Sequence, residues 1–247
     1  GVGDASVGIG VVDGGAWIWD SVTSTLGLSN PSNAGALDTR VDLGGEGFSS
    51  DLTVSGLPGG GYQLVDPATG RVFTLATDGA TPQLGLSRKL AASAGLVSRQ
   101  GARSGYLIDE LTGMITTTEV STGGRPPSPL ELDGPIKTVL DRHDVLWALS
   151  ASSGSLTLIL DGKQTQRREF SGLASTASLG VTSEGGAVLD AAHKRALVVT
   201  GTSAAREISL SRIAAGTSHL SDRDVDGPLA WATIDGTTEL WRVPTDG

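Results

Sequence analysis

The sequence predicts an all-β protein with a single domain over residues 1–247. We expect a six-bladed β-propeller of four-stranded antiparallel blades, in which the last blade has no evident fourth strand. A unit made of an apolar strand, a turn and a second strand recurs six times, at intervals of about 43 residues. No helical segment separates the units, and a period of about 40 residues built from strands alone is typical of propeller blades.

The six hairpins are the middle two strands of each predicted blade. In two of them the turn is Asp-x-x-x-Gly, from Asp66 to Gly70 and from Asp109 to Gly113. The Asp is expected to accept backbone N–H groups inside the turn, and the Gly to adopt a positive φ. The fifth turn lacks a Gly, and the sixth predicts a two-residue type I′ turn. The residues that open the turns are Asp20, Asp66, Asp109, Ser150, Asp190 and Asp235.

Each blade also needs an innermost strand before its hairpin and an outermost strand after it. The predicted innermost strands are Val7–Val12, Leu52–Val54, Ala94–Val97, Ile136–Leu140, Ala177–Val181 and Thr217–Leu220. The predicted outermost strands are Asp38–Leu43, Gln83–Leu86, Pro129–Leu132, Gln166–Phe170 and Arg206–Leu210. None is predicted for the sixth blade, for which Gly1–Ser6 is a poor substitute. In the third blade a Pro/Gly-rich insertion, Ser121–Ser128, predicts a long, extended surface loop.

Composition excludes several classes of function. The net charge is −9 and Lys and Arg form no cluster, so we expect no nucleic-acid partner and no contact of this domain with anionic membranes. Cysteine is absent, which excludes disulfides, thiolate catalysis and Cys-based zinc sites. No apolar run approaches the roughly 18 residues that a membrane-spanning helix requires. No cofactor is expected.

The strongest metal-binding pattern is the D-x-D-x-D-G string of Asp222, Asp224 and Asp226. Carboxylates two residues apart before a Gly are typical of calcium loops. However, the acidic residue that such loops place at the ninth or twelfth position is Ala230 or Thr233 here. We therefore interpret the string as a solvated turn, and a calcium site at these three aspartates remains the alternative.

Other polar and aromatic candidates have structural interpretations. His143 lies between Asp141 and Asp144, but the other histidines, His193 and His219, belong to different blades, so no convergent site is predicted. Three tryptophans recur at nearly one strand position, which favours packing between blades over a carbohydrate platform. These are Trp17, Trp147 and Trp231; Trp19 and Trp241 are less regular, which leaves partial exposure open.

Two classes of function remain. A non-catalytic binding or architectural module, with other protein modules or surface glycans as partners, needs only a rigid disc with variable loops. The alternative is a propeller-fold hydrolase or lyase, lactonase-like or glycosidase-like, that uses carboxylates at the channel mouth. The candidate carboxylates are scattered and mostly lie at turns: Asp42, Glu46, Asp141, Asp144, Glu184 and Asp222. We therefore favour the non-enzymatic module.

A resemblance adds an expected location. Residues 11–30 read VVDGGAWIWDSVTSTLGLSN and are followed by degenerate D-P-A-T-G units. This sequence resembles the extracytoplasmic N-terminal region of large actinobacterial surface proteins that carry fibronectin type III or bacterial Ig-like modules. The resemblance implies an exported, cell-surface location within a larger membrane-anchored chain, and a role in surface architecture or recognition. It supplies no catalytic residues.

Overall fold

The computed structural model describes residues 7–12, 15–29, 39–58, 60–77, 82–120, 122–182, 185–200, 204–210, 218–220, 229–234 and 237–242. In these ranges every regular element is a strand except one short 3₁₀ helix, η1 (Ala191–His193), as an all-β fold requires. The contacts divide the chain into two compact units. These are Gly1–Gln100 with Leu107–Leu111, and Gly101–Tyr106 with Thr112–Gly247. The single domain stays a prediction.

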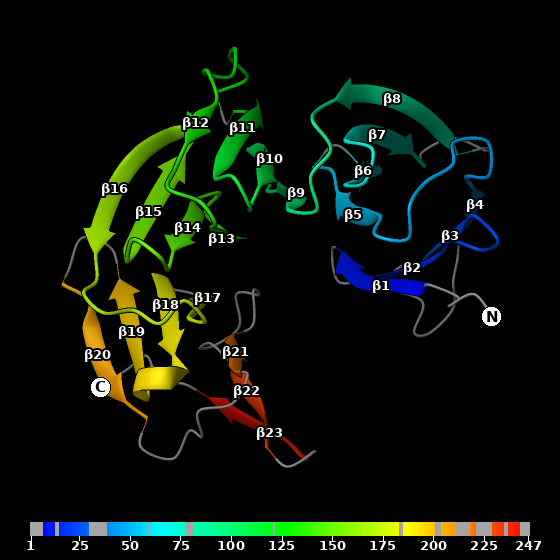
Figure 1. The fold of residues 1–247 in the computed structure, drawn as a ribbon. Coiled ribbons are helices and arrows are strands. Elements are labelled where there is room, and N and C mark those ends of the chain that lie inside the picture. The colour runs from blue at the N-terminus through cyan, green and yellow to red at the C-terminus, as the bar shows by residue number, and fades with distance from the viewer. Residues whose placement is uncertain are drawn as a thin grey trace. The chain divides into compact units, whose positions relative to one another are not determined.

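The strands form six antiparallel sheets in chain order (Figure 1). The first contains β1 (Val7–Val12), β2 (Gly15–Asp20), β3 (Thr25–Leu28) and β4 (Thr39–Asp42). The second contains β5 (Thr53–Gly56), β6 (Tyr62–Asp66), β7 (Arg71–Ala76) and β8 (Gln83–Lys89). The third contains β9 (Leu96–Gln100), β10 (Gly105–Asp109), β11 (Met114–Glu119) and β12 (Leu130–Glu131).

The fourth sheet contains β13 (Lys137–Leu140), β14 (Leu146–Ser150), β15 (Ser155–Leu160) and β16 (Lys163–Glu169). The fifth contains β17 (Ser178–Thr182), β18 (Gly185–Asp190), β19 (Arg195–Thr200) and β20 (Arg206–Ser209). The sixth has only three strands within the described ranges, β21 (Ser218–Leu220), β22 (Leu229–Ile234) and β23 (Thr237–Arg242). The prediction of four-stranded blades is therefore met by five sheets and not by six.

The hairpin turns confirm the predicted positive φ of the closing Gly, and Asp109 accepts the backbone N–H of Leu111 as predicted, whereas Asp66 accepts hydroxyl groups instead. Gly70, Gly113 and Gly154 have φ values of 68°, 82° and 70°, as the closing position requires. Where the sequence has no Gly, Ser24 and Lys194 still adopt a φ of 53°. In the five four-stranded sheets the closing residue of the turn also accepts a backbone N–H from the residue after the outermost strand, for example from Leu90 to Gly70 and from Leu210 to Lys194. The turn geometry therefore persists without Gly, at the cost of a less favourable backbone conformation.

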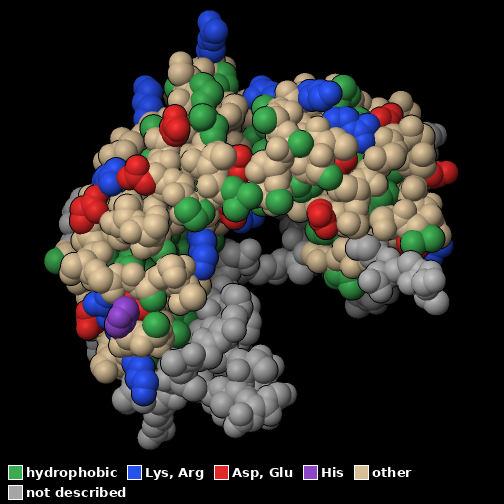
Figure 2. All heavy atoms as spheres, viewed as in Figure 1, with side chains coloured by type: hydrophobic (Ala, Val, Ile, Leu, Met, Phe, Trp, Pro, Cys, Tyr) green, Lys and Arg blue, Asp and Glu red, His purple; other side chains and the backbone are tan. Residues whose placement is uncertain are grey.

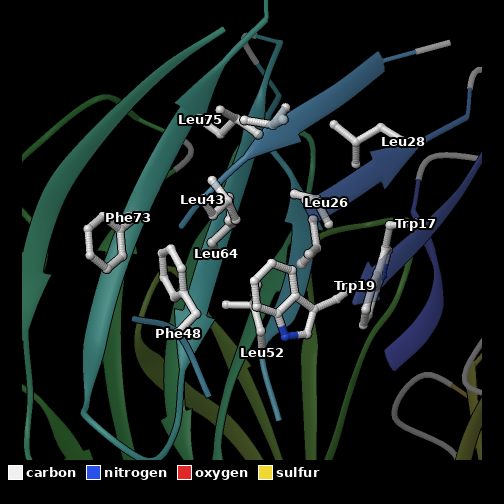
Figure 3. Close-up of a cluster of buried hydrophobic side chains, with 12 residues drawn as sticks. Trp17, Trp19, Leu26, Leu28, Leu43, Phe48, Leu52, Leu64, Phe73 and Leu75 are labelled. Atoms are coloured by element: carbon white, nitrogen blue, oxygen red, sulfur yellow. The ribbon is translucent and has the colours of Figure 1, made fainter. Parts of the chain in front are cut away.

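Within the first unit, the core lies between the first two sheets (Figure 3). Trp19 is fully buried and stacks edge-on against Phe48, with 6.0 Å between ring centroids. Phe48 in turn contacts Phe73 at 4.8 Å. The indole Nε1 of Trp19 donates a hydrogen bond to the Ser49 carbonyl at 2.8 Å. Trp19, whose exposure the sequence left open, is thus a central core residue, because the segment that follows β4 folds over it.

Within the second unit, the fourth and fifth sheets pack together through Trp147, Leu149 and Leu156 on one side and Val188 and Leu197 on the other. A Cβ added to Gly186 would lie 2.6 Å from the indole ring of Trp147. The ring therefore rests directly on the backbone of β18. The prediction that Trp17 and Trp147 are packing residues is confirmed, since they are 8% and 3% exposed. The side chains of Trp231 and Trp241 lie outside the described residues.

Candidate functional site

The carboxylates that open the hairpin turns are the most regular polar feature of the structure. Asp66, at the end of β6, is fully buried. It accepts hydrogen bonds from the Ser49 hydroxyl at 2.6 Å and the Thr69 hydroxyl at 2.7 Å. Arg71 Nη2 lies 3.5 Å from its Oδ2. Burial opposes ionisation, but these donors outweigh it and lower the pKa of Asp66.

The Asp that opens the hairpin turn has different hydrogen-bond donors in the third and fifth sheets. Asp109 accepts from the Ser93 hydroxyl at 2.7 Å and from the Leu111 backbone. The fully buried Asp190 faces His193 Nδ1 at 2.8 Å and Arg195 Nε at 3.1 Å. Each of these carboxylates is thus held by donors from its own turn, the preceding segment, or both. These hydrogen bonds organise the hairpins.

Asp20 occupies the equivalent position in the first sheet, with a different surrounding. It accepts from the Thr23 hydroxyl at 2.8 Å and from the backbone N–H groups of Val22 and Thr23. The hydroxyl of Thr23, followed by its backbone N–H, lowers the pKa of Asp20. Among the described residues its donors come from the turn itself, whereas Asp66 also has a donor, Ser49, from the segment before β5. Asp20 is accordingly half-buried.

The Asp141–Asp144 loop places a histidine between two carboxylates. Asp141 accepts the backbone N–H groups of His143 at 2.8 Å and Val145 at 3.0 Å, and the indole N–H of Trp147 at 2.8 Å. Asp144 accepts the backbone N–H of Arg103 at 3.1 Å and adopts a φ of 63°. His143 is exposed beside Arg142. The two carboxylates therefore stabilise a tight loop, and the surface histidine that the sequence suggested is confirmed.

The remaining predicted candidates do not converge either. Asp42 accepts the Gly44 backbone N–H, and Glu46 pairs with Arg71 at 3.6 Å. Across the residues that the structure describes, no group of three or more His, Asp or Glu side chains is arranged to hold a metal ion. The calcium candidates Asp222, Asp224 and Asp226 lie outside the described residues, as do Glu184 and the side chain of His219.

Two serines and two arginines that contact the turn aspartates were missed at the sequence level. Ser49 and Ser93 precede the aspartates that they contact by 17 and 16 residues, a recurring spacing that would have identified them. Arg71 also lies over the rings of Phe48 and Phe73, at 5.5 Å and 5.4 Å. Arg71 and Arg195 both follow the turn Asp by five residues. An Asp-x-x-x-x-Arg pattern was therefore legible in two of the units.

One sheet face carries apolar side chains that no described residue covers. Ile9 pairs with Ile18 across β1 and β2 and is 70% exposed. The equivalent residues, Val54 opposite Leu64 and Leu179 opposite Val188, are 7% and 5% exposed. A cavity of about 390 Å³ opens on this face of the first sheet. Its lining residues are Ile18, Asp20, Thr23, Thr25, Gly27 and Arg40.

The cavity has a simple cause in the sequence. Gly27 lies opposite Ile18, at the place that Phe73 occupies opposite Leu64 and Leu197 occupies opposite Val188. A missing side chain at that place leaves space over the sheet. The face therefore combines the exposed Ile9 and the half-buried Ile18 with polar side chains around the cavity. On the face of the molecule seen in Figure 2, acidic and basic side chains of the described residues are interspersed.

No protein-family model matches the chain, and no curated protein matches it. Solved structures do. A catalytically inactive virginiamycin B lyase from Staphylococcus aureus with quinupristin has a TM-score of 0.61 and 14% identity, over 99% of this chain and 87% of that one. BBS1N in complex with ARL6DN has a TM-score of 0.58 and 11% identity, over 96% and 77%. The Cps50 (Swd1) β-propeller domain of Myceliophteria thermophila has a TM-score of 0.58 and 9% identity, over 97% and 93%.

These similarities establish a class of fold: the chain has the fold of β-propellers. At this level of identity they extend to the fold alone. Among the described residues no helix is long and apolar enough to cross a membrane.

Proposed function

We propose that this chain is a non-catalytic interaction module whose partner is another protein. The observation that supports this most directly is that its loop carboxylates are already hydrogen-bonded within the protein. Asp66, Asp109, Asp141 and Asp190 already accept hydrogen bonds from two or more internal donors. A general acid or base needs an open approach to substrate, whereas these groups stabilise a scaffold that presents loops. Some propellers of similar fold, such as BBS1N with ARL6DN, are in protein complexes.

We further propose that the six sheets are blades of a six-bladed propeller, with the three-stranded sheet as the last blade. The three strands of that sheet pair antiparallel in chain order, as the strands of the other five sheets do. In a closed ring each blade has a neighbour on both faces. The exposed Ile9 on the first sheet supports such a ring, because a neighbouring blade would cover it.

A labelling experiment tests closure. The chain has no cysteine, so single variants Ile9→Cys and Val22→Cys each carry one thiol. Both native side chains are 70% exposed, and Val22 lies at a turn. A ring that covers Ile9 predicts labelling by a maleimide about tenfold slower at position 9 than at position 22. Equal rates would exclude closure over this face.

The cell-surface location is part of the same proposal and rests on the resemblance of residues 11–30 and the D-P-A-T-G unit. Fractionation of cells that express the full-length protein tests it. Surface exposure to added protease is expected, whereas full protection in intact cells would contradict export. Surface glycans are the alternative to a protein partner, and the binding experiment below distinguishes the two.

The function is tested with the purified domain immobilised and exposed to solubilised surface proteins and, separately, to a glycan array. A retained protein is then purified and its affinity measured pairwise against the domain. Saturable protein binding is expected. Binding confined to glycans would reject the protein partner, and absence of either would count against an interaction module.

A lyase is the second candidate, because structures of virginiamycin B and streptogramin B lyases cover 93% to 99% of this chain and His143 is exposed in a loop. Incubation with quinupristin, followed by mass spectrometry, tests it. No conversion of quinupristin is expected. Conversion that His143→Ala abolishes, with unchanged thermal stability, would establish the lyase instead.

A further inference from the structure

The β11–β12 connection contains a short segment whose conformation is set almost entirely by proline. Residues 125–129 read Arg-Pro-Pro-Ser-Pro. Proline fixes φ at about −65°, and a residue that precedes proline is restricted to extended backbone. All five positions are one or the other. These restrictions favour polyproline II, which needs no internal hydrogen bonds, and the segment has no regular hydrogen-bonded structure here.

The segment is anchored to the protein along one edge. A Cβ added to Gly162, in the β15–β16 turn, would lie 2.5 Å from Cγ of Pro127. The Pro127 ring thus packs on the backbone of that turn, and only Gly, with a φ of 74° at this point, leaves room for it. Before the segment, the Gly123 N–H donates to the Val120 carbonyl at 2.9 Å. These contacts fix the base and the middle of the loop.

Polyproline II repeats every three residues, so it has three edges. Pro127 occupies the edge that contacts Gly162. Pro126 and Pro129 share a second edge, and Arg125 and Ser128 share the third. Arg125, Ser128 and Pro129 are exposed, and Pro126 is half-buried. The loop extends beyond the ends of β11 and β12 in Figure 1.

We propose that residues 125–129 are a docking segment for a partner protein with an aromatic-lined polyproline groove. The P-x-x-P spacing of Pro126 and Pro129 is the spacing that such grooves accept, and the preformed helix lowers the entropy lost on binding. Arg125, beside this edge, selects a groove that is bordered by a carboxylate. This inference rests on the proposed function, because it names the kind of protein that the module binds.

The test uses the intact protein and an array of purified SH3 and WW domains as probes, with affinities measured by biolayer interferometry. The variants are Pro126→Ala/Pro129→Ala and Arg125→Glu. The matched controls are Pro58→Ala, an exposed turn proline, and Lys163→Glu, an exposed cation on β16. At least one domain with an acidic groove is expected to bind. The double proline variant should weaken that binding by about tenfold or more, and the controls should change it by less than about twofold.

Two results would overturn the inference: no domain of the array binds the wild-type protein, or binding survives the double proline substitution. Circular dichroism melting of the double variant serves as the folding control, since Pro129 is exposed and Pro126 is half-buried. The proposed function fails separately. If a surface partner found by immobilisation binds the double variant unchanged, the interaction module stands and this docking segment does not.

Discussion

Removal of the Asp66 carboxylate is expected to destabilise the protein strongly. In Asp66→Ala the hydroxyls of Ser49 and Thr69 lose their acceptor, and Arg71 loses a partner 3.5 Å away. Breaking a buried, hydrogen-bonded charge pair costs about 3–5 kcal/mol. Because Arg71 keeps 21% exposure, water can partly replace the carboxylate, which favours the lower end, about 3 kcal/mol. For a chain of this length that loss corresponds to a fall in Tm of roughly 6–12 °C.

The assay is thermal unfolding followed by tryptophan fluorescence. Trp19 is a local reporter, since its Nε1 donates to the carbonyl of Ser49, whose hydroxyl contacts Asp66. Asp20→Ala is the matched control, because Asp20 has the same place in its hairpin but is half-buried and takes its donors only from its own turn. Its Tm should fall much less. Equal shifts for the two variants would refute the argument that burial of Asp66 makes its hydrogen bonds important.

Three further predictions follow from individual side chains. The pKa of Asp66 is lowered, so its stabilising effect is present above the unfolded-state pKa of about 4 and is lost as pH falls through the lower folded-state pKa. The Tm difference between wild type and Asp66→Asn should therefore shrink in acid. A constant Tm difference from pH 7 to pH 2 would contradict this. Burial raises the pKa of Tyr106. Its hydroxyl lies near Ser104, Asp161 and Gly162 but makes no well-aligned hydrogen bond to a described residue, so Tyr106→Phe should not lower Tm at pH 7 and should reduce the loss of stability above about pH 10. A lower Tm of the variant at pH 7 would show that one of these neighbours does form a stabilising hydrogen bond. Gly186→Ala should lower Tm, because the added Cβ would meet the Trp147 ring. Gly85→Ala on β8, where nothing lies within 4 Å of an added Cβ, should leave Tm unchanged or raise it. Equal effects of the two substitutions on Tm would show that the indole does not rest on β18.

The hairpins illustrate what the sequence determined by itself. Turns such as Asp66–Gly70 depend on a few neighbouring residues, and strand alternation is equally local, so the period, the hairpins and most strand positions were predictable. The innermost strand Val7–Val12 was predicted with its observed bounds. The fifth turn shows the limit of this reasoning, since Lys194 adopts the positive φ that the sequence pattern assigns to Gly.

Only the tertiary structure decided which of these equivalent residues are buried. Asp20 and Asp66 open their turns in the same way, yet only Asp66 is enclosed, because Ser49 and Phe48 come from a separate segment that folds over it. Trp19 is buried for the same reason. Whether the loop carboxylates are free to react was likewise undecidable, since their donors lie up to 41 residues away, as for Asp144 and Arg103. Local sequence preferences determine the repeating hairpins. Burial, charge pairing and access to solvent depend on contacts between distant segments, and these contacts exist only in the folded chain.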